Sequence, residues 1–384
     1  MSEEIKEKEK SRDMADQIKI CLLGGSGTGK SCFFSGLYQA MVGNSVTIGS
    51  SENKADVFLN VVEIDKTEGF FGDNETIKNA IYSAAQMEND YLIDERGFDS
   101  IVSTAESTAF IFELYINNTV CCEIKIMDYA GELLDNPTEE TAQTDLDRLC
   151  QLLGDCDAII IFADAIEVAK NINNRNQLQQ TIHALRLNSM FTSILQTASR
   201  NRHKLSTLIV LSKSDSAIIP DNIRANNFSI VSDQIANEIF RRTINQTQSA
   251  GGSTGVVPIS AVGDHNTNRN NEIIRDADIS QKNIDVSVLF CIYNAVERKI
   301  AHQNAYLEEL NYQLKKLGWN KKAEKQDIKT MIDNLTKRRD LLQNIREILK
   351  SDSDYFDKNI NELHMYGTTM VGSTSDTTYR KGKK

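Results

Sequence analysis

Long apolar runs, an excess of basic residues and a secretory leader are all missing from this sequence. No unbroken apolar run is longer than that of Ala158–Ala163, whereas a membrane-spanning helix needs roughly 18 such residues. The segment Met1–Asp13 is charged and lacks the apolar stretch of a signal peptide. The 43 Lys and Arg residues face 54 Asp and Glu residues, giving a formal net charge of −11, which argues against nucleic-acid binding by clustered basic residues. We therefore expect a cytoplasmic protein whose partners include neither a nucleic acid nor a membrane.

Ligand patterns built from cysteine and histidine are also missing. The seven cysteines include no Cys-x-x-Cys pair, and the five histidines show no metal-ligand spacing. We therefore expect reduced thiols, and neither a metal-binding Cys/His cluster nor a Cys/His nucleophile. Hydrophobic residues make up 40% of the chain, which excludes disorder over its whole length.

Short β-branched runs alternate with helical patterns from Gln17 onward, which is typical of a parallel α/β sheet. The expected strands are Ile18–Leu23, Ala109–Ile116, Val120–Met127, Asp157–Phe162, Leu208–Leu211 and Val256–Ile259. The expected helices are Ser31–Met41, Thr141–Leu153, Gln177–Ser199, Asp233–Thr243 and Val286–Ile300. Asn117-Asn118 suits a two-residue hairpin turn, which makes one antiparallel pair within an otherwise parallel set.

A heptad-like pattern begins after Ile300. Two stretches with apolar residues at heptad spacing flank Gly318-Trp319-Asn320, which predicts a helical hairpin or coiled-coil arm. This hairpin either packs on the flank of the preceding domain or presents a surface to a partner. The chain then divides into a polar arm (1–16), an α/β domain (17–300) with insertions at about 43–103 and 170–205, the hairpin (301–350), and a tail (351–384) that is disordered at its end.

The strongest chemical signal is a match to the GxxxxGK[ST] phosphate-binding loop, placed between an expected strand and an expected helix. Its glycines let successive backbone N–H groups turn toward a β-phosphate, Lys30 adds charge at the β- and γ-phosphates, and the Ser31 hydroxyl ligates Mg²⁺. We expect Lys30 to face solvent as a phosphate ligand. The nucleotide-binding residues predicted here are Gly24, Gly25, Ser26, Gly27, Thr28, Gly29, Lys30, Ser31 and Cys32.

A second signal, Asp128-Tyr129-Ala130-Gly131-Glu132, stands at the end of an apolar strand. A carboxylate in this place associates with Mg²⁺, usually through a coordinated water. Gly131 would let a backbone N–H approach the γ-phosphate closely. We therefore assign Asp128 to the metal site, and Lys30, Gly131 and Glu132 to the catalytic residues.

Two loops after later strands favour guanine over adenine. In Ser212-Lys213-Ser214-Asp215, the Asp215 carboxylate would accept from the guanine N1–H and N2–H₂ groups, donors that adenine lacks, while the Lys213 stem can lie over the base. Ser260, Ala261 and Val262 follow the last strand, and their backbone N–H groups could meet the guanine O6. All these motifs stand at the carboxyl ends of strands, where open α/β sheets bind ligands.

With these motifs in this order, the sequence resembles the Ras-like P-loop GTPases of the translation-factor-related class over roughly residues 17–300. It also looks like bacterial stand-alone G proteins with insertions. The resemblance implies a P-loop G domain with a mostly parallel six-stranded sheet, one antiparallel strand and helices on both faces. The sequence departs from the family at Ser212, where Asn or Thr is usual, and at Glu132, where Ras-like members have Gln.

The resemblance also implies a switch threonine whose hydroxyl reaches Mg²⁺. Thr47 is the nearest to the phosphate-binding loop in sequence. In the Ras-like order, however, this threonine immediately precedes the strand that forms a hairpin with the DxxG strand. That strand is Ala109–Ile116, so Thr104 and Thr108 are the candidates for the metal site, and residues 43–103 contain an insertion.

The function we predict is binding of GTP and GDP with Mg²⁺ and slow hydrolysis of GTP to GDP and phosphate, as a molecular switch. A protein effector would bind through the hairpin or the switch segments. One alternative is a hydrolysis-deficient pseudo-GTPase whose hairpin is the active surface. Another is a P-loop ATPase, in which both guanine-favouring loops would be coincidental. A dynamin-like membrane remodeller is disfavoured because the helical part lacks a lipid-facing stripe.

Overall fold

The computed structural model describes thirteen stretches of the chain. They are residues 17–25, 27–42, 44–49, 54–64, 108–128, 153–154, 156–171, 206–225, 254–263, 266–268, 280–317, 321–351 and 364–366. The expected helices 177–199 and 233–243, and all but the end of 141–153, lie outside these stretches.

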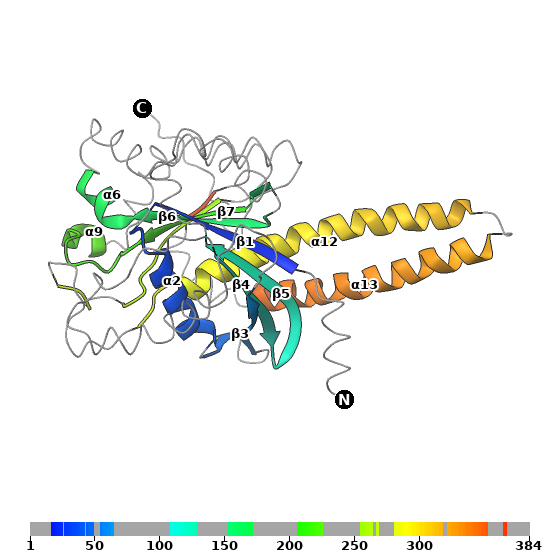
Figure 1. Cartoon of the computed structure of the whole chain (residues 1–384), viewed down its shortest axis with the longest axis horizontal. Coiled ribbons are helices and arrows are strands. Elements are labelled where there is room, and N and C mark those ends of the chain that lie inside the picture. Colours follow the sequence, from blue (N-terminus) through cyan, green and yellow to red (C-terminus); the bar gives the residue numbers. More distant parts are fainter. Residues whose placement is uncertain are drawn as a thin grey trace.

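A nine-stranded mixed sheet forms the centre of the fold (Figure 1). Its strands are β1 (Gln17–Leu23), β2 (Val46–Ile48), β3 (Ala55–Ile64), β4 (Thr108–Ile116), β5 (Thr119–Asp128), β6 (Ala158–Asp164), β7 (Ser206–Ser212), β8 (Thr254–Pro258) and β9 (His364–Tyr366). They are arranged in the order β2-β3-β4-β5-β1-β6-β7-β8-β9. The central strands β5, β1, β6, β7 and β8 pair in parallel, and the pairs toward the two edges are antiparallel.

The six expected strands are present as β1, β4, β5, β6, β7 and β8. Asn117 and Asn118 have φ values of 48° and 63°, the positive values that a two-residue hairpin turn requires. The sheet is nonetheless larger than the six strands expected, because β2, β3 and β9 add three antiparallel strands. β2 and β3 come from the segment 43–103, so this insertion begins by extending the sheet beyond β4.

The described helices are α2 (Lys30–Leu37), which continues into the π-helical turn η1 (Tyr38–Val42), α6 (Ala165–Asn171), α9 (Asp221–Ala225), α12 (Ile284–Lys316) and α13 (Lys322–Ser351). Together α2 and η1 occupy the expected helix 31–41. The first turn of α12 packs against α2 so closely that a Cβ on Gly36 would lie 2.2 Å from Cδ1 of Ile284. A side chain larger than hydrogen at Gly36 would therefore require the end of the Ile284 side chain to move.

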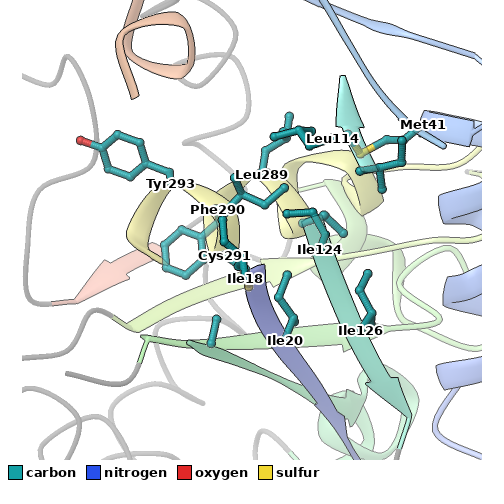
Figure 2. Close-up of a cluster of buried hydrophobic side chains, with 14 of the residues drawn as sticks. Ile18, Ile20, Met41, Leu114, Ile124, Ile126, Leu289, Phe290, Cys291 and Tyr293 are labelled. Carbon is teal, nitrogen blue, oxygen red and sulfur yellow. The ribbon is translucent and has the colours of Figure 1, made fainter. Parts of the chain in front are cut away.

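The main core lies between the sheet and the helices α2, α12 and α13. Figure 2 shows the part of it between the sheet and α12. Ile20 of β1, Ile126 of β5 and Leu289 and Phe290 of α12 are all fully buried in it. β7 is buried along its whole length, as a central parallel strand covered on both faces should be. The six cysteines among the described residues are free thiols, and all but Cys32 are buried.

α12 is a single helix that serves both the core and the hairpin. The expected helix 286–300 and the first arm of the expected hairpin are continuous within it. The first half of α12 is buried on the sheet, while its second half extends away from the sheet with α13 running back beside it (Figure 1). Within the described part of the chain, no helix is both long and apolar enough to cross a bilayer.

The hairpin is buried at its base and exposed beyond it. Leu342 and Leu349 of α13 belong to the main core, with exposures of 1%. Leu307 and Leu310 of α12 are buried against α13, whereas Met331 is 44% exposed. The last turns of α13 are therefore part of the domain, and only the outer part of the hairpin has its two helices as each other's main support.

A pair of substitutions on α13 tests this division. Leu342→Ala should lower the free energy of unfolding by about 2–5 kcal/mol, because it leaves a cavity in the main core. Met331→Ala on the same helix should change it by less than about 0.5 kcal/mol, since exposed positions are usually tolerant. Chemical denaturation followed by circular dichroism measures both values. Equal effects for the two variants would contradict the burial difference.

An ionic cluster fastens α12 to the amino-terminal edge of the sheet. Asp157, which precedes β6, accepts from the Lys19 amide (2.9 Å) and is ion-paired with Arg298 and with Lys299 (3.4 Å to the latter). Asp157 is buried, so its charge depends on these partners. This edge lies opposite the carboxyl ends of the parallel strands, where β1 leads into the phosphate-loop sequence.

Candidate functional site

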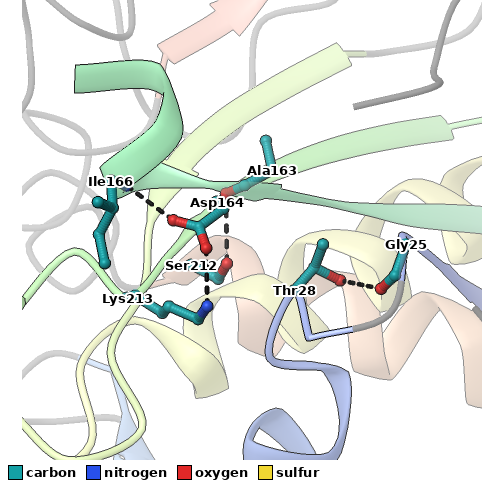
Figure 3. Close-up of polar contacts among 7 residues, drawn as sticks. All are labelled: Gly25, Thr28, Ala163, Asp164, Ile166, Ser212 and Lys213. Carbon is teal, nitrogen blue, oxygen red and sulfur yellow. Dashed lines mark hydrogen bonds and ion pairs between the residues drawn. The ribbon is translucent and has the colours of Figure 1, made fainter. Parts of the chain in front are cut away.

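The phosphate-loop sequence forms a tight turn between β1 and α2. At Gly24 a Cβ would lie 2.7 Å from Thr28 Oγ1 and 2.8 Å from Phe162 Cβ, so the close approach to β6 requires glycine. The Thr28 hydroxyl donates to the Gly25 carbonyl (2.8 Å) and closes the turn (Figure 3). Gly24, Gly25, Gly27, Thr28, Gly29, Lys30, Ser31 and Cys32 are described, while Ser26 and the side chain of Ser31 are not.

The ammonium group of Lys30 is enclosed by its own loop. Lys30 is only 6% exposed, and its Nζ donates to the carbonyls of Gly24 (2.7 Å) and Gly25 (3.1 Å). The expectation that Lys30 faces solvent is therefore wrong. The reason is that a buried charge needs hydrogen-bond partners, and the curled loop provides them from its backbone.

The loop after β7 carries Asp215 into a buried position. The amide and hydroxyl of Ser214 both donate to the Ile259 carbonyl (3.2 and 2.9 Å), which ties this loop to the one after β8. Asp215 is 4% exposed. Its backbone carbonyl accepts from the hydroxyl of Thr267 (3.3 Å), a residue that the sequence motifs do not indicate. Backbone contacts thus help to fix the position of Asp215.

The loop after β8 offers fewer free amides than expected. Ser260 exchanges two backbone hydrogen bonds with Lys282 (3.2 and 2.8 Å). Its hydroxyl accepts from the amides of Val262 (3.1 Å) and Gly263 (2.7 Å). Within the part of the chain that the structure describes, no acceptor is bonded to the amide of Ala261. Of the three amides that could meet a guanine O6, those of Ser260 and Val262 are thus engaged within the protein, which leaves that of Ala261 as the candidate donor.

The phosphate loop and the loop after β7 touch each other. A Cβ on Gly29 would lie 3.6 Å from Cβ of Ser212, and Gly29 has a φ of 92°, so the two backbones pass with little between them. In the first turn of α2, loss of hydration raises the pKa of the half-buried Cys32 thiol to about 12, with Lys213 lowering this pKa and Asp215 raising it further. Both charged groups therefore act on the same point at the start of α2.

One residue at this edge was missed by the sequence motifs. Asp164 is the last residue of β6, and its carboxylate forms an ion pair with the Lys213 ammonium (2.7 Å, Figure 3). The same carboxylate accepts from the Ile166 amide (2.8 Å) at the start of α6. An acidic residue at the end of a buried strand is the signal that pointed to Asp128, and it could have pointed to Asp164 as well.

The backbone of Asp128 reaches the same edge of the sheet. Asp128 is the last residue of β5, opposite Leu22 on β1 and Thr108 on β4. β1 leads directly into the phosphate loop, so strand register brings Thr108 and Asp128 beside the start of that loop. Outside the described residues lie Ser26, Thr104, Gly131 and Glu132, together with the side chains of Ser31, Thr108 and Asp128.

Comparison with protein-family models gives no match, and comparison with curated protein sequences gives none either. Among solved structures, the chain is similar to the signal recognition particle receptor SRb-GTP/SRX complex from Chaetomium thermophilum, at 13% identity and a TM-score of 0.30. That similarity covers 64% of this chain and 94% of the other.

Proposed function

We propose that the protein binds guanine nucleotides together with Mg²⁺ and hydrolyses GTP to GDP and phosphate, acting as a molecular switch. The observation that carries the proposal is the meeting of the phosphate loop with the loop after β7. Gly29 lies against Ser212, and Cys32 of α2 lies within electrostatic reach of Asp215. A phosphate cradle and a buried carboxylate at one edge of the sheet fit the two ends of one nucleotide.

The base would be recognised by groups from two loops. The buried Asp215 carboxylate would accept from guanine N1–H and N2–H₂, and the Ala261 amide would donate to O6. The Ser212 hydroxyl donates to the Ala163 carbonyl (3.3 Å). This side chain is short enough for the loop after β7 to approach Gly29 closely. Adenine would present a donor where Ala261 donates and no donors to Asp215, so we expect it to be rejected.

The phosphates would be held by the loop amides and Lys30. The Lys30 ammonium is already placed inside the loop by Gly24 and Gly25, so it needs little reorganisation to stabilise charge on the transferring phosphoryl group. The Gly131 amide would sense the γ-phosphate. Loss of that contact after hydrolysis would let the switch segment relax.

The predicted metal ligands fit Mg²⁺ by their chemistry. They are the Ser31 hydroxyl, the Asp128 carboxylate and a hydroxyl from Thr104 or Thr108, and Mg²⁺ prefers such oxygen donors. The backbones of Asp128 and Thr108 pair across β5 and β4 next to the phosphate loop. When bound, Mg²⁺ neutralises charge on the β- and γ-phosphate oxygens.

Nucleotide binding and phosphate release on the purified full chain test this proposal. Titration with fluorescent GTP, GDP and ATP analogues at fixed Mg²⁺ should show tight binding of the guanine nucleotides alone. Phosphate release from GTP should then be slow but measurable. If ATP binds as well as GTP, the protein is a P-loop ATPase. If GTP binds without phosphate release under any condition, the protein is a pseudo-GTPase.

The pseudo-GTPase is the second candidate, because the hairpin favours an interaction role. Tyr306, Tyr312 and Met331 on its outer part are 39%, 58% and 44% exposed. Exposed aromatic and methionine side chains are enriched in protein interfaces. A protein effector that binds the hairpin or the switch segments is compatible with either candidate.

Glu132→Gln tests whether Glu132 limits the rate of hydrolysis or is a productive catalytic residue. Glutamate can accept from the attacking water, but it has no amide donors and it adds negative charge beside the γ-phosphate. We therefore expect single-turnover phosphate release to stay unchanged or to rise by up to about tenfold. The Kd for GTP, measured in parallel, should not change. A large loss of rate would mean that Glu132 is a productive catalytic residue.

A further inference from the structure

Lys213 is held by a carboxylate from a neighbouring strand. Asp164 Oδ2 lies 2.7 Å from Lys213 Nζ, while Oδ1 accepts from the Ile166 amide (2.8 Å). Because Ser212 is the register partner of Asp164, the pairing of β6 and β7 brings the two side chains together. Both oxygens of Asp164 are therefore committed, and the carboxylate presents one fixed direction to the ammonium group.

The Lys213 backbone also has an unusual conformation. Its φ is 57°, in the left-handed region that residues other than glycine rarely adopt. The Ser216 amide donates to the Lys213 carbonyl (3.1 Å) and stabilises this turn. A long lysine side chain leaving such a turn could reach many positions, but the ion pair with Asp164 selects one of them.

We propose that Asp164 is a positioning residue of the nucleotide site, which holds the Lys213 side chain where its aliphatic stem covers the guanine ring. The inference rests on the proposed binding of guanine nucleotides. Asp164 acts through Lys213, not through a contact of its own with the nucleotide. Without it, Lys213 has to be ordered during binding, and affinity falls by the cost of that ordering.

The positioning role and simple charge repulsion predict opposite changes in nucleotide affinity when the Asp164 charge is removed. A nucleotide is a polyanion, so removing the negative charge of Asp164 should tighten binding if only Coulomb repulsion mattered, and more for GTP than for GDP. A positioning role predicts weaker binding. It also predicts the same factor for GTP and GDP, because the base is common to both.

The test is a double-mutant cycle on the full chain. Asp164→Asn removes the charge but keeps an oxygen for the Ile166 amide, so α6 retains its start. We expect it to weaken GTP and GDP equally, by about 3- to 10-fold. Lys213→Met keeps an apolar stem without the ammonium, and in that background Asp164→Asn should have little further effect. Asp221→Asn, at an exposed residue of α9, is the matched control for charge and should leave both affinities unchanged.

Competition titration at about 0.15 M salt, with thermal unfolding as the check on folding, gives every quantity in the cycle. Unchanged or tighter binding in Asp164→Asn overturns the inference, and so does an effect that persists undiminished beside Lys213→Met. A larger loss for GTP than for GDP would place the action of Asp164 at the phosphates and also overturns it. If the parent chain binds no guanine nucleotide, the proposed function itself fails, which is a different result.

Discussion

Lys30→Ala should reduce the affinity for GTP by about 10²- to 10³-fold and leave the fold intact. The substitution removes charge-assisted hydrogen bonds to the phosphates, each of which contributes about 1.5–3 kcal/mol. Lys30 donates to the Gly24 and Gly25 carbonyls of its own loop, and these can turn to water when the ammonium is lost. GDP should lose less affinity than GTP, because it lacks the γ-phosphate.

Calorimetric titration with GTP and GDP measures both losses, and thermal unfolding checks the fold. The matched control is Lys322→Ala, which removes the same charge from an exposed position at the start of α13. It should bind both nucleotides as the parent chain does. Parental rates of GTP hydrolysis in Lys30→Ala would mean that the loop after β1 does not hold the phosphates.

The strands show where sequence patterns are sufficient and where they are not. β6 is an unbroken apolar run up to its last residue, Asp164, so its position and its burial follow from the sequence. In β3 the alternation is equally readable, since Val57 and Leu59 are buried while Asp56 and Asn60 are exposed. This alternation could have predicted the strand within the insertion. β2 and β9 are three residues long, and a segment so short becomes a strand only through the neighbour it pairs with.

The continuity of α12 could also have been predicted. The chain from Ile284 to Lys316 contains neither proline nor glycine, so nothing interrupts the helix at Ile300. What changes near Ile300 is the partner of the apolar face, from the sheet to α13. A change of periodicity therefore indicated a change of packing partner and not the end of a helix.

The candidate site likewise contains parts that the sequence predicts and parts that it does not. Its phosphate loop is contiguous in sequence, and the spacing of glycines and Lys30 predicts the turn directly. The Asp164–Lys213 pair joins residues 49 positions apart, and it depends on the register between β6 and β7. Likewise, the Val262 amide donates to the Ser260 hydroxyl and not to a ligand. This contact follows from local loop geometry that no motif specifies.

Asp215→Asn should change the preference of the site from GTP to XTP. The Asp215 carboxylate would accept two hydrogen bonds from guanine, and the asparagine amide replaces one acceptor oxygen with a donor that faces a guanine donor. Losing a buried charge-assisted pair costs roughly 2–5 kcal/mol, which is about 30-fold to several thousand-fold in affinity for GTP. Xanthine carries a carbonyl at C2 in place of the amine, so the new donor suits XTP. ATP should bind poorly to both proteins.

The substitution should leave the loop in place, because hydrogen bonds of Ser214 and of the Asp215 carbonyl hold its backbone. Ser214 is bonded to the Ile259 carbonyl, and Thr267 to the Asp215 carbonyl. A weakened but unswitched variant is therefore not explained by a collapsed pocket, provided that thermal unfolding matches the parent. Competition of GTP, XTP and ATP against one labelled nucleotide decides the matter on both proteins. If ATP displaces the label from the parent chain as well as GTP does, Asp215 does not read guanine and the loop after β7 is a coincidental match.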